Sequence, residues 1–257
     1  MFFSILVPTM GTREYELNRL LESLSLQTFK DFEVIVVSQI NHDVPEKLAD
    51  KWSASISIQH IKLERAGLSY ARNEGLPYCK GEWVILSDDD AWYPDDGLAN
   101  IRSCADECNI VLTQIFDPVK NESYKNYGAD GGWVKNKLQL MSRSSIEIAF
   151  RREAVESNFN EQFGLGAKYV CGEEVDFLLN NFKKRTVKYC PVVTVYHLKK
   201  QQNSTDAQLF AKGAIYAKNF NRFIAFLITM RDKLKRRGLN SEIFWNGYKD
   251  YKAGNKR

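Results

Sequence analysis

Four short apolar runs alternate with segments of helical periodicity in the first third of the chain, and this alternation restricts the possible fold most strongly. Strands that are apolar along their whole length are typical of a sheet covered on both faces. The order strand, helix, strand, helix predicts a doubly wound, mostly parallel α/β sheet flanked by helices. The expected strands are residues 2–7, 32–37, 56–63 and 83–86, and the expected helices lie within 14–26, 45–52 and 67–75.

The rest of the chain predicts fewer regular elements. Residues 117–145 are rich in loop-forming residues, and Pro191 divides the last apolar segment into two expected strands, because proline cannot donate a ladder hydrogen bond. The remaining expected strands are 110–115, 146–150, 187–189 and 192–197, and the remaining expected helices are 96–108, one beginning near 173, and a tail helix from 208 onward.

Polar residues follow three of the first four expected strands at their carboxyl ends. They are Pro8-Thr9, Ser38-Gln39 and the acidic run Asp88–Asp90. Right-handed crossovers bring such strand ends to one edge of a parallel sheet, and open α/β sheets bind their ligands at that edge. An edge with small polar loops and an acidic tip suits a nucleotide.

The run Asp88-Asp89-Asp90 has two interpretations. Three adjacent carboxylates repel one another, and Mg²⁺ or Mn²⁺ often binds one or two carboxylates together with substrate phosphates. Aspartate also favours turns and helix N-caps, so the run could instead be an acidic turn before the next helix. The local sequence favours neither interpretation.

Glycine-rich phosphate-binding signatures are absent. Neither GxGxxG nor GxxxxGK[ST] occurs, and the first loop, residues 8–13, contains only Gly11. A loop of this composition cannot surround phosphates with backbone amides alone. A nucleotide bound here would therefore need a metal to neutralise its phosphates, which favours the metal interpretation of the aspartates.

A second acidic pair, Glu173-Glu174, follows Gly172 at the start of an expected helix. Acidic residues are favourable in the first helical turn in any case. The pair also follows the loop Gly164-Leu165-Gly166, and a carboxylate in this position could serve as a general base. His197, at the end of the last strand, is more often a structural residue than a functional one.

The charge is distributed unevenly along the chain. Residues 209–257 contain 12 Lys or Arg and 3 Asp or Glu, a net charge of +9, whereas residues 1–208 carry −5. Apolar residues of this tail recur at helical spacing and precede a basic cluster. A helix of this kind either lies in a membrane interface or packs against the rest of the protein with its charges in solvent.

Cysteine usage and hydropathy indicate a cytosolic protein. The five cysteines include no CxxC pair, and no pair of histidines lies near them to complete a zinc site. We therefore expect reduced thiols. The N-terminus has no basic region before its short apolar run, so we expect no signal peptide, and no apolar stretch approaches the roughly 20 residues that span a bilayer.

Five motifs, in order, resemble those of the family 2 inverting glycosyltransferases, which have the GT-A fold. The resemblance extends from about Phe3 to about His197, and His197 falls where that fold commonly has a histidine near the metal. The motifs are Ser4-Ile-Leu-Val-Pro-Thr9, Gln27-Thr-Phe-Lys-Asp-Phe-Glu-Val-Ile-Val-Val37, Arg65-Ala-Gly-Leu-Ser-Tyr-Ala-Arg-Asn73, the DxD-like Ser87-Asp-Asp-Asp-Ala-Trp-Tyr-Pro94 and Gly172-Glu-Glu174.

The resemblance implies a role for individual residues. Glu174 takes the position of the catalytic base, although the family usually has aspartate there, and Glu173 could exchange roles with it. Gln39 replaces a frequent acidic residue, and its amide could pair with a uracil edge. The implied donor-binding residues are Pro8, Thr9, Arg13, Gln39, Arg72, Asp88 and Asp89; the implied metal ligands are Asp90, Asp88 and His197; Glu173 and Trp92 fall on the acceptor side.

The implied activity is metal-dependent transfer of a hexose from a nucleotide sugar, with UDP as the expected nucleotide and Mn²⁺ or Mg²⁺ as cofactor. The expected acceptor is a hydroxyl of a glycan or lipid-linked glycan in bacterial surface-polysaccharide synthesis. The expected location is the cytoplasm, with contact to the inner-membrane surface and no nucleic-acid partner. The expected domains are a catalytic domain at 1–207, divided into a nucleotide-sugar half (1–115) and an acceptor half (116–207), and a basic amphipathic tail at 208–257.

Two rival functions remain. A nucleotidyltransferase also uses a sheet and metal-binding carboxylates of this kind, but it usually has a glycine-rich basic loop after its first strand, which residues 8–13 lack. A non-catalytic nucleic-acid-binding protein could use the basic tail, but the acidic body and the absence of a nucleic-acid-binding signature argue against it.

Overall fold

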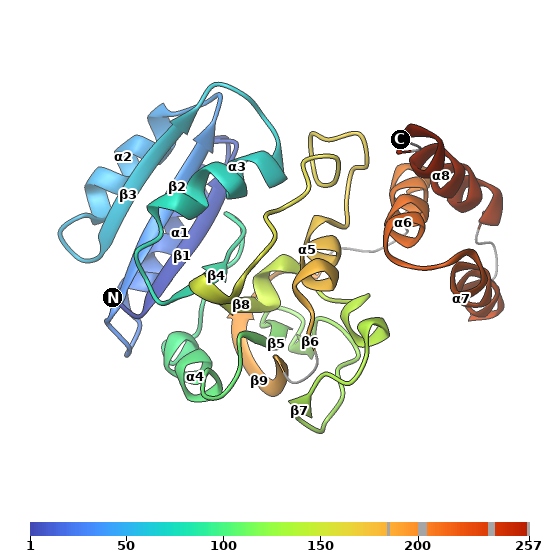
Figure 1. Cartoon of the computed structure of the whole chain (residues 1–257). Helices are drawn as coiled ribbons and strands as arrows, with labels where there is room; N and C mark the ends of the chain where they lie inside the picture. The colour runs from blue at the N-terminus through green and yellow to red at the C-terminus, as the bar shows by residue number, and fades with distance from the viewer. Residues whose placement is uncertain (184–185, 200–204, 236–239, 256–257) are drawn as a thin grey trace.

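The computed structural model describes residues 1–183, 186–199, 205–235 and 240–255, with the backbone alone for 231–235. Its strands form a nine-stranded mixed sheet in the order β3-β2-β1-β4-β8-β5-β9-β7, with β6 paired to β5 (Figure 1). The strands are β1 (Phe3–Thr9), β2 (Phe32–Gln39), β3 (Ser57–Leu63), β4 (Trp83–Leu86), β5 (Ile110–Asp117), β6 (Glu122–Ser123), β7 (Gly132–Trp133), β8 (Ile148–Arg151) and β9 (Val187–Tyr196).

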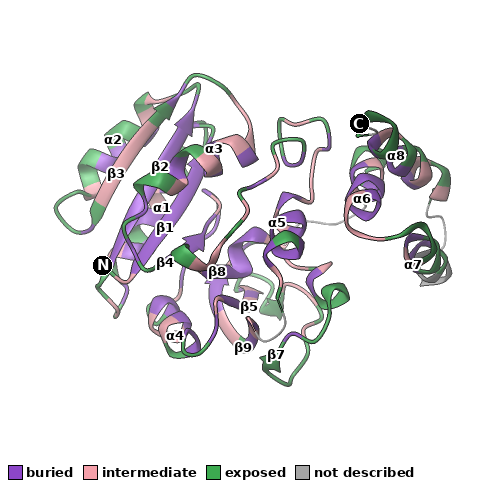
Figure 2. Cartoon of the chain, in the orientation of Figure 1, coloured by how far each residue is buried: buried purple, intermediate pink, exposed green. Residues whose placement is uncertain are grey.

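The first four strands are parallel, as the alternation of strands and helices predicts. β1 lies between β2 and β4, and β3 pairs with the far side of β2. β1 and β2 are buried along their whole length, whereas β3 is partly exposed (Figure 2). The helices are α1 (Glu14–Ser25), α2 (Asp43–Trp52), α3 (Leu68–Gly75), α4 (Gly97–Cys104), α5 (Glu173–Asn181), α6 (Asp206–Asn219), α7 (Arg222–Lys235) and α8 (Ser241–Gly254).

Two hydrophobic clusters cover the two faces of the sheet. Because side chains alternate along a strand, Ile5 packs with α1 and α4 on one face, and Leu6 packs with α3 and α5 on the other. The doubly wound arrangement expected from the sequence is therefore confirmed, and it brings the carboxyl ends of β1, β2 and β4 to one edge.

β9 differs from the expectation of two short strands. It runs without interruption from Val187 to Tyr196 through Pro191. Its pairing with β5 shifts register, since Leu112 faces Tyr189 but Gln114 faces Val193. The irregular register accommodates the proline, which lacks a backbone donor, and the strand continues.

The tail also differs from the expectation of one helix beginning at 208. It forms α6, α7 and α8, and α6 begins at Asp206, where Thr205 and Gln208 make a reciprocal capping box. The backbones of α6 and α8 are in close contact, because a Cβ on Gly213 would lie 2.0 Å from the Phe244 carbonyl oxygen. The apolar spacing continues through these breaks, although Asn221 and Gly238 are residue types that commonly begin or end helices.

The tail helices share the core of the sheet. Ala214 and Ile215 of α6 and Phe244 of α8 belong to the same buried cluster as Leu6. Asp176 of α5 is fully buried and accepts hydrogen bonds from Lys218 Nζ at 2.6 Å and from Asn219 Nδ2 at 3.0 Å. α6 thus packs against the helix that begins with Glu173.

Candidate functional site

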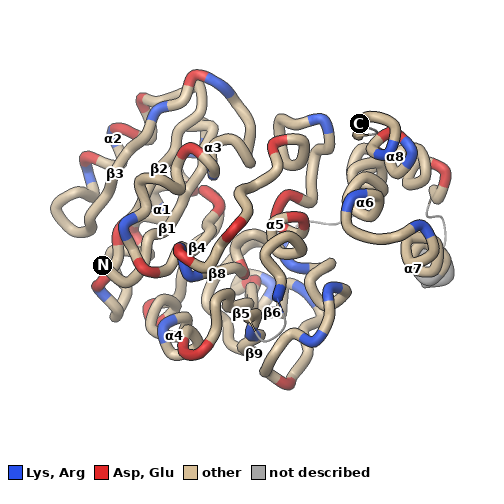
Figure 3. The backbone as a smooth tube through the Cα atoms, viewed as in Figure 1, with Lys and Arg blue, Asp and Glu red and all other residues tan. Residues whose placement is uncertain are grey.

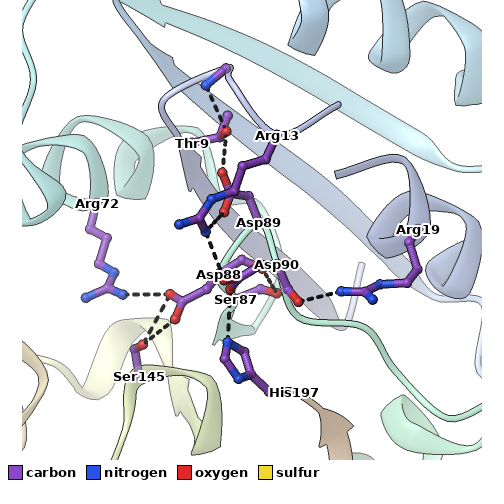
Figure 4. Close-up of polar contacts among 11 residues, drawn as sticks. Thr9, Arg13, Arg19, Arg72, Ser87, Asp88, Asp89, Asp90, Ser145 and His197 are labelled. Carbon is purple, nitrogen blue, oxygen red and sulfur yellow. Dashed lines mark hydrogen bonds and ion pairs between the residues drawn. The ribbon is translucent and has the colours of Figure 1, made fainter. Parts of the chain in front are cut away.

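The three carboxylates of the run Asp88–Asp90, which follows β4, each contact a different pair of residues (Figure 4). Asp88 contacts Arg72 and Ser145, Asp89 contacts Thr9 and Arg13, and Asp90 contacts Arg13 and His197. The structure therefore brings together residues from β1, α3, β4 and β9. Of the two interpretations of this run, a simple helix-capping turn is wrong, because the Asp96 N-cap of α4 lies further along the chain.

Asp89 connects the loop after β1 to the loop after β4. It is buried, and it accepts hydrogen bonds from Thr9 Oγ1 at 2.7 Å and Arg13 Nη1 at 2.9 Å. Thr9 Oγ1 in turn accepts from the Gly11 amide at 3.0 Å. Burial raises the pKa of Asp89, while the Thr9 hydrogen bond and the Arg13 charge oppose that shift. Asp89 thus holds the loop after β1 against the loop after β4.

Asp90 lies between two basic groups. Arg13 Nη1 is 2.9 Å from its Oδ2, and His197 Nε2 is 3.1 Å from its Oδ1. His197 Nδ1 lies 2.9 Å from the Leu198 carbonyl oxygen, which can only accept, so Nδ1 carries a proton. In the neutral ring, Nε2 then has a lone pair and lies beside a carboxylate oxygen of Asp90. A nitrogen and an oxygen ligand in this arrangement could bind one divalent cation together.

The cation would need further ligands from outside the protein. Among the residues that the structure describes, no three His, Cys, Asp or Glu side chains converge on a point that could hold a metal ion. Mg²⁺ and Mn²⁺ commonly retain waters and bind one or two carboxylates together with substrate phosphates. Asp90 and His197 fit such a site, whereas Asp88 contacts Arg72 and Ser145.

Arg72 joins the two acidic motifs. It is fully buried on α3, and it donates from Nη1 to Glu173 Oε1 at 3.0 Å and from Nη2 to Asp88 Oδ1 at 3.3 Å. Burial raises the pKa of Asp88, the Arg72 charge opposes this shift, and the Asp90 and Glu173 carboxylates add to it. Arg72 therefore holds the start of α5 against the end of β4.

Glu173 and Glu174 have different surroundings at the start of α5. Glu173 is buried and paired with Arg72, whereas Glu174 is partly exposed. Burial, and then the neighbouring Glu173 carboxylate, raise the pKa of Glu174 to about 8. Gly172 precedes them with φ of +92°, and a Cβ there would lie 2.9 Å from Ile215 Cγ1, so this turn requires glycine. Of this pair, Glu174 combines partial exposure with a raised pKa, two properties that suit a general base.

Gln39 at the end of β2 has a fixed amide orientation. Its Oε1 accepts a hydrogen bond from the Gly67 amide at 2.7 Å, and a backbone N–H can only donate. The carbonyl end of the side chain is therefore occupied, and the amide N–H groups remain available to a ligand. Pro8, one of the other expected donor-binding residues, is buried within β1 and aligns with Val37.

Two residues of the site had no sequence signal. Ser145 Oγ donates to Asp88 at 3.3 Å from the far end of the loop-rich segment. Arg19 of α1 donates to the Asp90 carbonyl at 2.8 Å, and its guanidinium lies 3.6 Å from the Trp92 ring centroid. Both are ordinary residues in their own sequence context. Only the packing of distant elements reveals them.

Trp92, expected on the acceptor side, borders a separate cavity. Its backbone pairs with Tyr196, and Arg19 covers its ring. The cavity measures about 490 Å³ and is lined by residues of α1, the loop after β4 and the end of β9. Glu173 and Glu174 do not line it, so the acceptor role of Trp92 stays a prediction.

Comparisons with known proteins converge on one family. A family model described as glycosyl transferase family 2 matches residues 4–158. An uncharacterized glycosyltransferase of Haemophilus influenzae is 26% identical over 232 residues, covering 83% of this chain and 74% of the relative. A GalNAc(5)-diNAcBac-PP-undecaprenol beta-1,3-glucosyltransferase of Campylobacter jejuni is 25% identical over 79% of this chain and 66% of its own.

Other curated relatives match over short segments. Glycosyltransferase GlyA of Streptococcus pneumoniae is 34% identical over 94 residues, and the match covers 36% of this chain but 13% of GlyA. The match to the putative glycosyltransferase EpsH of Bacillus subtilis covers 32% of that protein. The chain thus spans a small part of these two relatives.

Solved structures share the fold. Staphylococcus aureus TarS 1–349 in complex with UDP-GlcNAc has a TM-score of 0.71 at 19% identity, covering 98% of this chain and 80% of TarS. The mannosyltransferase PcManGT of Pyrobaculum calidifontis, in complex with GDP-Man and Mn²⁺, has a TM-score of 0.62 at 17% identity, covering 98% and 74%. The likeness establishes the GT-A fold.

Proposed function

The chain belongs to glycosyl transferase family 2, and from this premise we propose that it transfers a hexose from a nucleotide sugar to a hydroxyl group, with inversion at the anomeric carbon. One observation carries the proposal. Arg72 bridges Asp88 of the acidic loop and Glu173 of α5, so the loop after β4 and the start of α5 lie together, which supports a shared reaction centre. A bound donor would place its diphosphate toward Asp90 and its sugar toward Glu174.

The proposed mechanism needs one base. Glu174 removes the proton of the acceptor hydroxyl while that oxygen attacks the anomeric carbon and the nucleoside diphosphate departs. Direct displacement without a protein nucleophile inverts the configuration. Arg13, which pairs with Asp89 and Asp90, is a cationic side chain beside the expected diphosphate position. A divalent cation bound by Asp90 and His197 would neutralise charge on the leaving group.

The raised pKa of Glu174 suits this role and predicts a pH profile. A base acts only when deprotonated, so kcat/KM should fall as the pH drops through the Glu174 pKa of about 8 in the free enzyme. A bound cation would lower the pKa of Glu174, so the pH at which kcat/KM falls would shift toward the ordinary range of a carboxyl group. Rates measured from acidic to alkaline pH with saturating Mn²⁺ would check this, and a flat profile across that range would contradict it.

Gln39 favours a uracil base in the donor. With its oxygen held by Gly67, it can offer only N–H donors, which match the O4 carbonyl of uracil and not the 4-amino group of cytosine. UDP and CDP differ at this position and at the neighbouring N3, which carries a proton in uracil and a lone pair in cytosine. We expect UDP to bind about tenfold more tightly than CDP, because the mismatch leaves polar groups unpaired.

Thermal unfolding with a panel of nucleotides and nucleotide sugars measures this preference and tests the proposed activity. Gln39→Glu keeps an acceptor for Gly67 but replaces the donor, so it should narrow or reverse the UDP preference over CDP. Equal protection of the wild-type protein by both nucleotides would refute the role of Gln39. No protection by any nucleotide sugar in the presence of Mn²⁺ would refute the donor-binding function itself.

The acceptor we propose is a glycan, or a glycan linked to lipid, as in bacterial surface-polysaccharide synthesis. The name of the C. jejuni relative includes undecaprenol, a lipid carrier, which supports this choice. In the described residues, no helix is both long and apolar enough to cross a bilayer. We propose a cytoplasmic protein that meets its acceptor at the membrane surface; the five cysteines are free thiols, which agrees with a reducing compartment.

A further inference from the structure

One face of α7 exposes four large apolar side chains. Phe223, Phe226, Leu227 and Met230 have exposed fractions of 68%, 49%, 50% and 44%. Their spacing of i, i+3, i+4 and i+7 places them on one side of the helix. The other exposed large apolar residues in the described part of the chain do not form such a series on any helix.

The opposite face of α7 is packed against the protein. Ala225, Ile228 and Thr229 are buried, and Ala225 and Ile228 belong to the core cluster that includes α6 and α8. The orientation of α7 is therefore fixed by its buried side, and its apolar outer face is not a sign of a loosely attached helix. Figure 1 shows α7 at the outside of the tail helices, away from the sheet.

The charge of this segment complements an anionic surface. Between residues 222 and 237 the sequence contains six Lys or Arg and one acidic residue, Asp232. Arg222 begins α7 before the apolar face, and Figure 3 shows basic colouring at the start of this helix. The other basic residues follow in sequence, and residues 236 and 237 lie outside the described part of the chain. Apolar side chains within a basic segment are typical of helices that lie in the interface of an anionic bilayer.

We propose that the outer face of α7 is a membrane-docking surface that binds anionic lipid bilayers, with its four apolar side chains inserted among the acyl chains and its basic residues at the headgroups. This inference deepens the proposed function, on which it rests for the lipid-linked acceptor. α7 packs on α6, and α6 packs on α5, which carries Glu174. Docking through α7 would therefore hold the reaction centre near the bilayer surface.

Vesicle sedimentation of the full chain tests the proposal. We expect the wild-type protein to bind vesicles with about 30% anionic lipid at low salt, more weakly at about 0.5 M salt, and least to neutral vesicles. Phe223→Ser/Leu227→Ser should lower binding at least about tenfold. Val119→Ser/Leu138→Ser removes two exposed apolar side chains far from α7 in sequence, one from the turn after β5 and one from a short 3-10 helix, and should bind like the wild type.

UDP should raise the unfolding temperature without vesicles present. This measurement tests the proposed donor binding separately from the proposed docking surface. The α7 variant should retain the protection, which also shows that it is folded. Loss of UDP protection in the wild type, with vesicle binding intact, would refute the proposed function alone. Failure of the wild type to bind anionic vesicles, or equal binding by the α7 variant, would refute the docking surface. A wild-type dimer that the variant converts to a monomer, without vesicle binding, would also overturn it.

Discussion

Glu174→Gln should lower kcat by about 10²–10⁴-fold while leaving donor affinity nearly unchanged, because it removes a general base without changing the size of the side chain. Two glutamates begin α5. Glu174 is partly exposed, whereas Glu173 is buried and paired with Arg72. Single-turnover kinetics with a UDP-sugar, together with calorimetric measurement of UDP binding, separates the two effects.

The same variant predicts a stability change with a definite sign. A carboxyl with a raised pKa favours the folded state at low pH, and this contribution is lost as the pH rises toward about 8. Glutamine has no such titration, so the variant should unfold at a temperature up to a few degrees above that of the wild type at pH 8. Wild-type turnover by Glu174→Gln would refute the assignment of the base.

Glu173→Gln is the matched comparison. It removes the carboxylate that pairs with the fully buried Arg72, so its main effect should be on folding stability, through a partly unpaired buried charge. If Glu173→Gln abolished turnover without destabilisation while Glu174→Gln remained active, the two residues would have exchanged roles.

Asp90→Asn should remove the metal dependence of donor binding. Asparagine keeps the shape of the side chain but lacks the negative charge that a hard cation prefers. Changes even in groups behind the metal ligands commonly cost 10- to about 100-fold in metal affinity, so loss of a direct ligand should cost at least about 100-fold. Calorimetry with UDP and Mn²⁺ measures the change, and UDP alone provides the baseline.

Asp96→Asn is a suitable control for charge. Asp96 is exposed on the same loop and its side chain makes no capping hydrogen bond, so donor binding should be unchanged. Arg13 keeps its ion pair with Asp89 in the Asp90→Asn variant, which favours an intact loop. Unchanged affinity of UDP and Mn²⁺ for Asp90→Asn would contradict a metal role for this residue.

Much of the edge that carries the site was predictable because its position follows from local patterns. The apolar runs before Thr9, Gln39 and Asp88 form β1, β2 and β4, and parallel topology brings their ends together. The contacts made at that edge were not predictable. Gln39 uses its carbonyl on Gly67, and Ser145 reaches Asp88 from a segment whose sequence has no clear periodicity.

By itself the sequence determined the order of strands and helices, the parallel half of the sheet and the set of acidic and polar residues at its edge, because hydrophobic periodicity is encoded within a few neighbouring residues. Tertiary structure alone decided which carboxylate pairs with which basic side chain. Arg72 contacts Asp88, 16 residues away in sequence, and Glu173, 101 residues away. It also decided that α7 of the tail presents an apolar face outward. Such choices depend on packing between distant segments, and the chain carries no local signal for them.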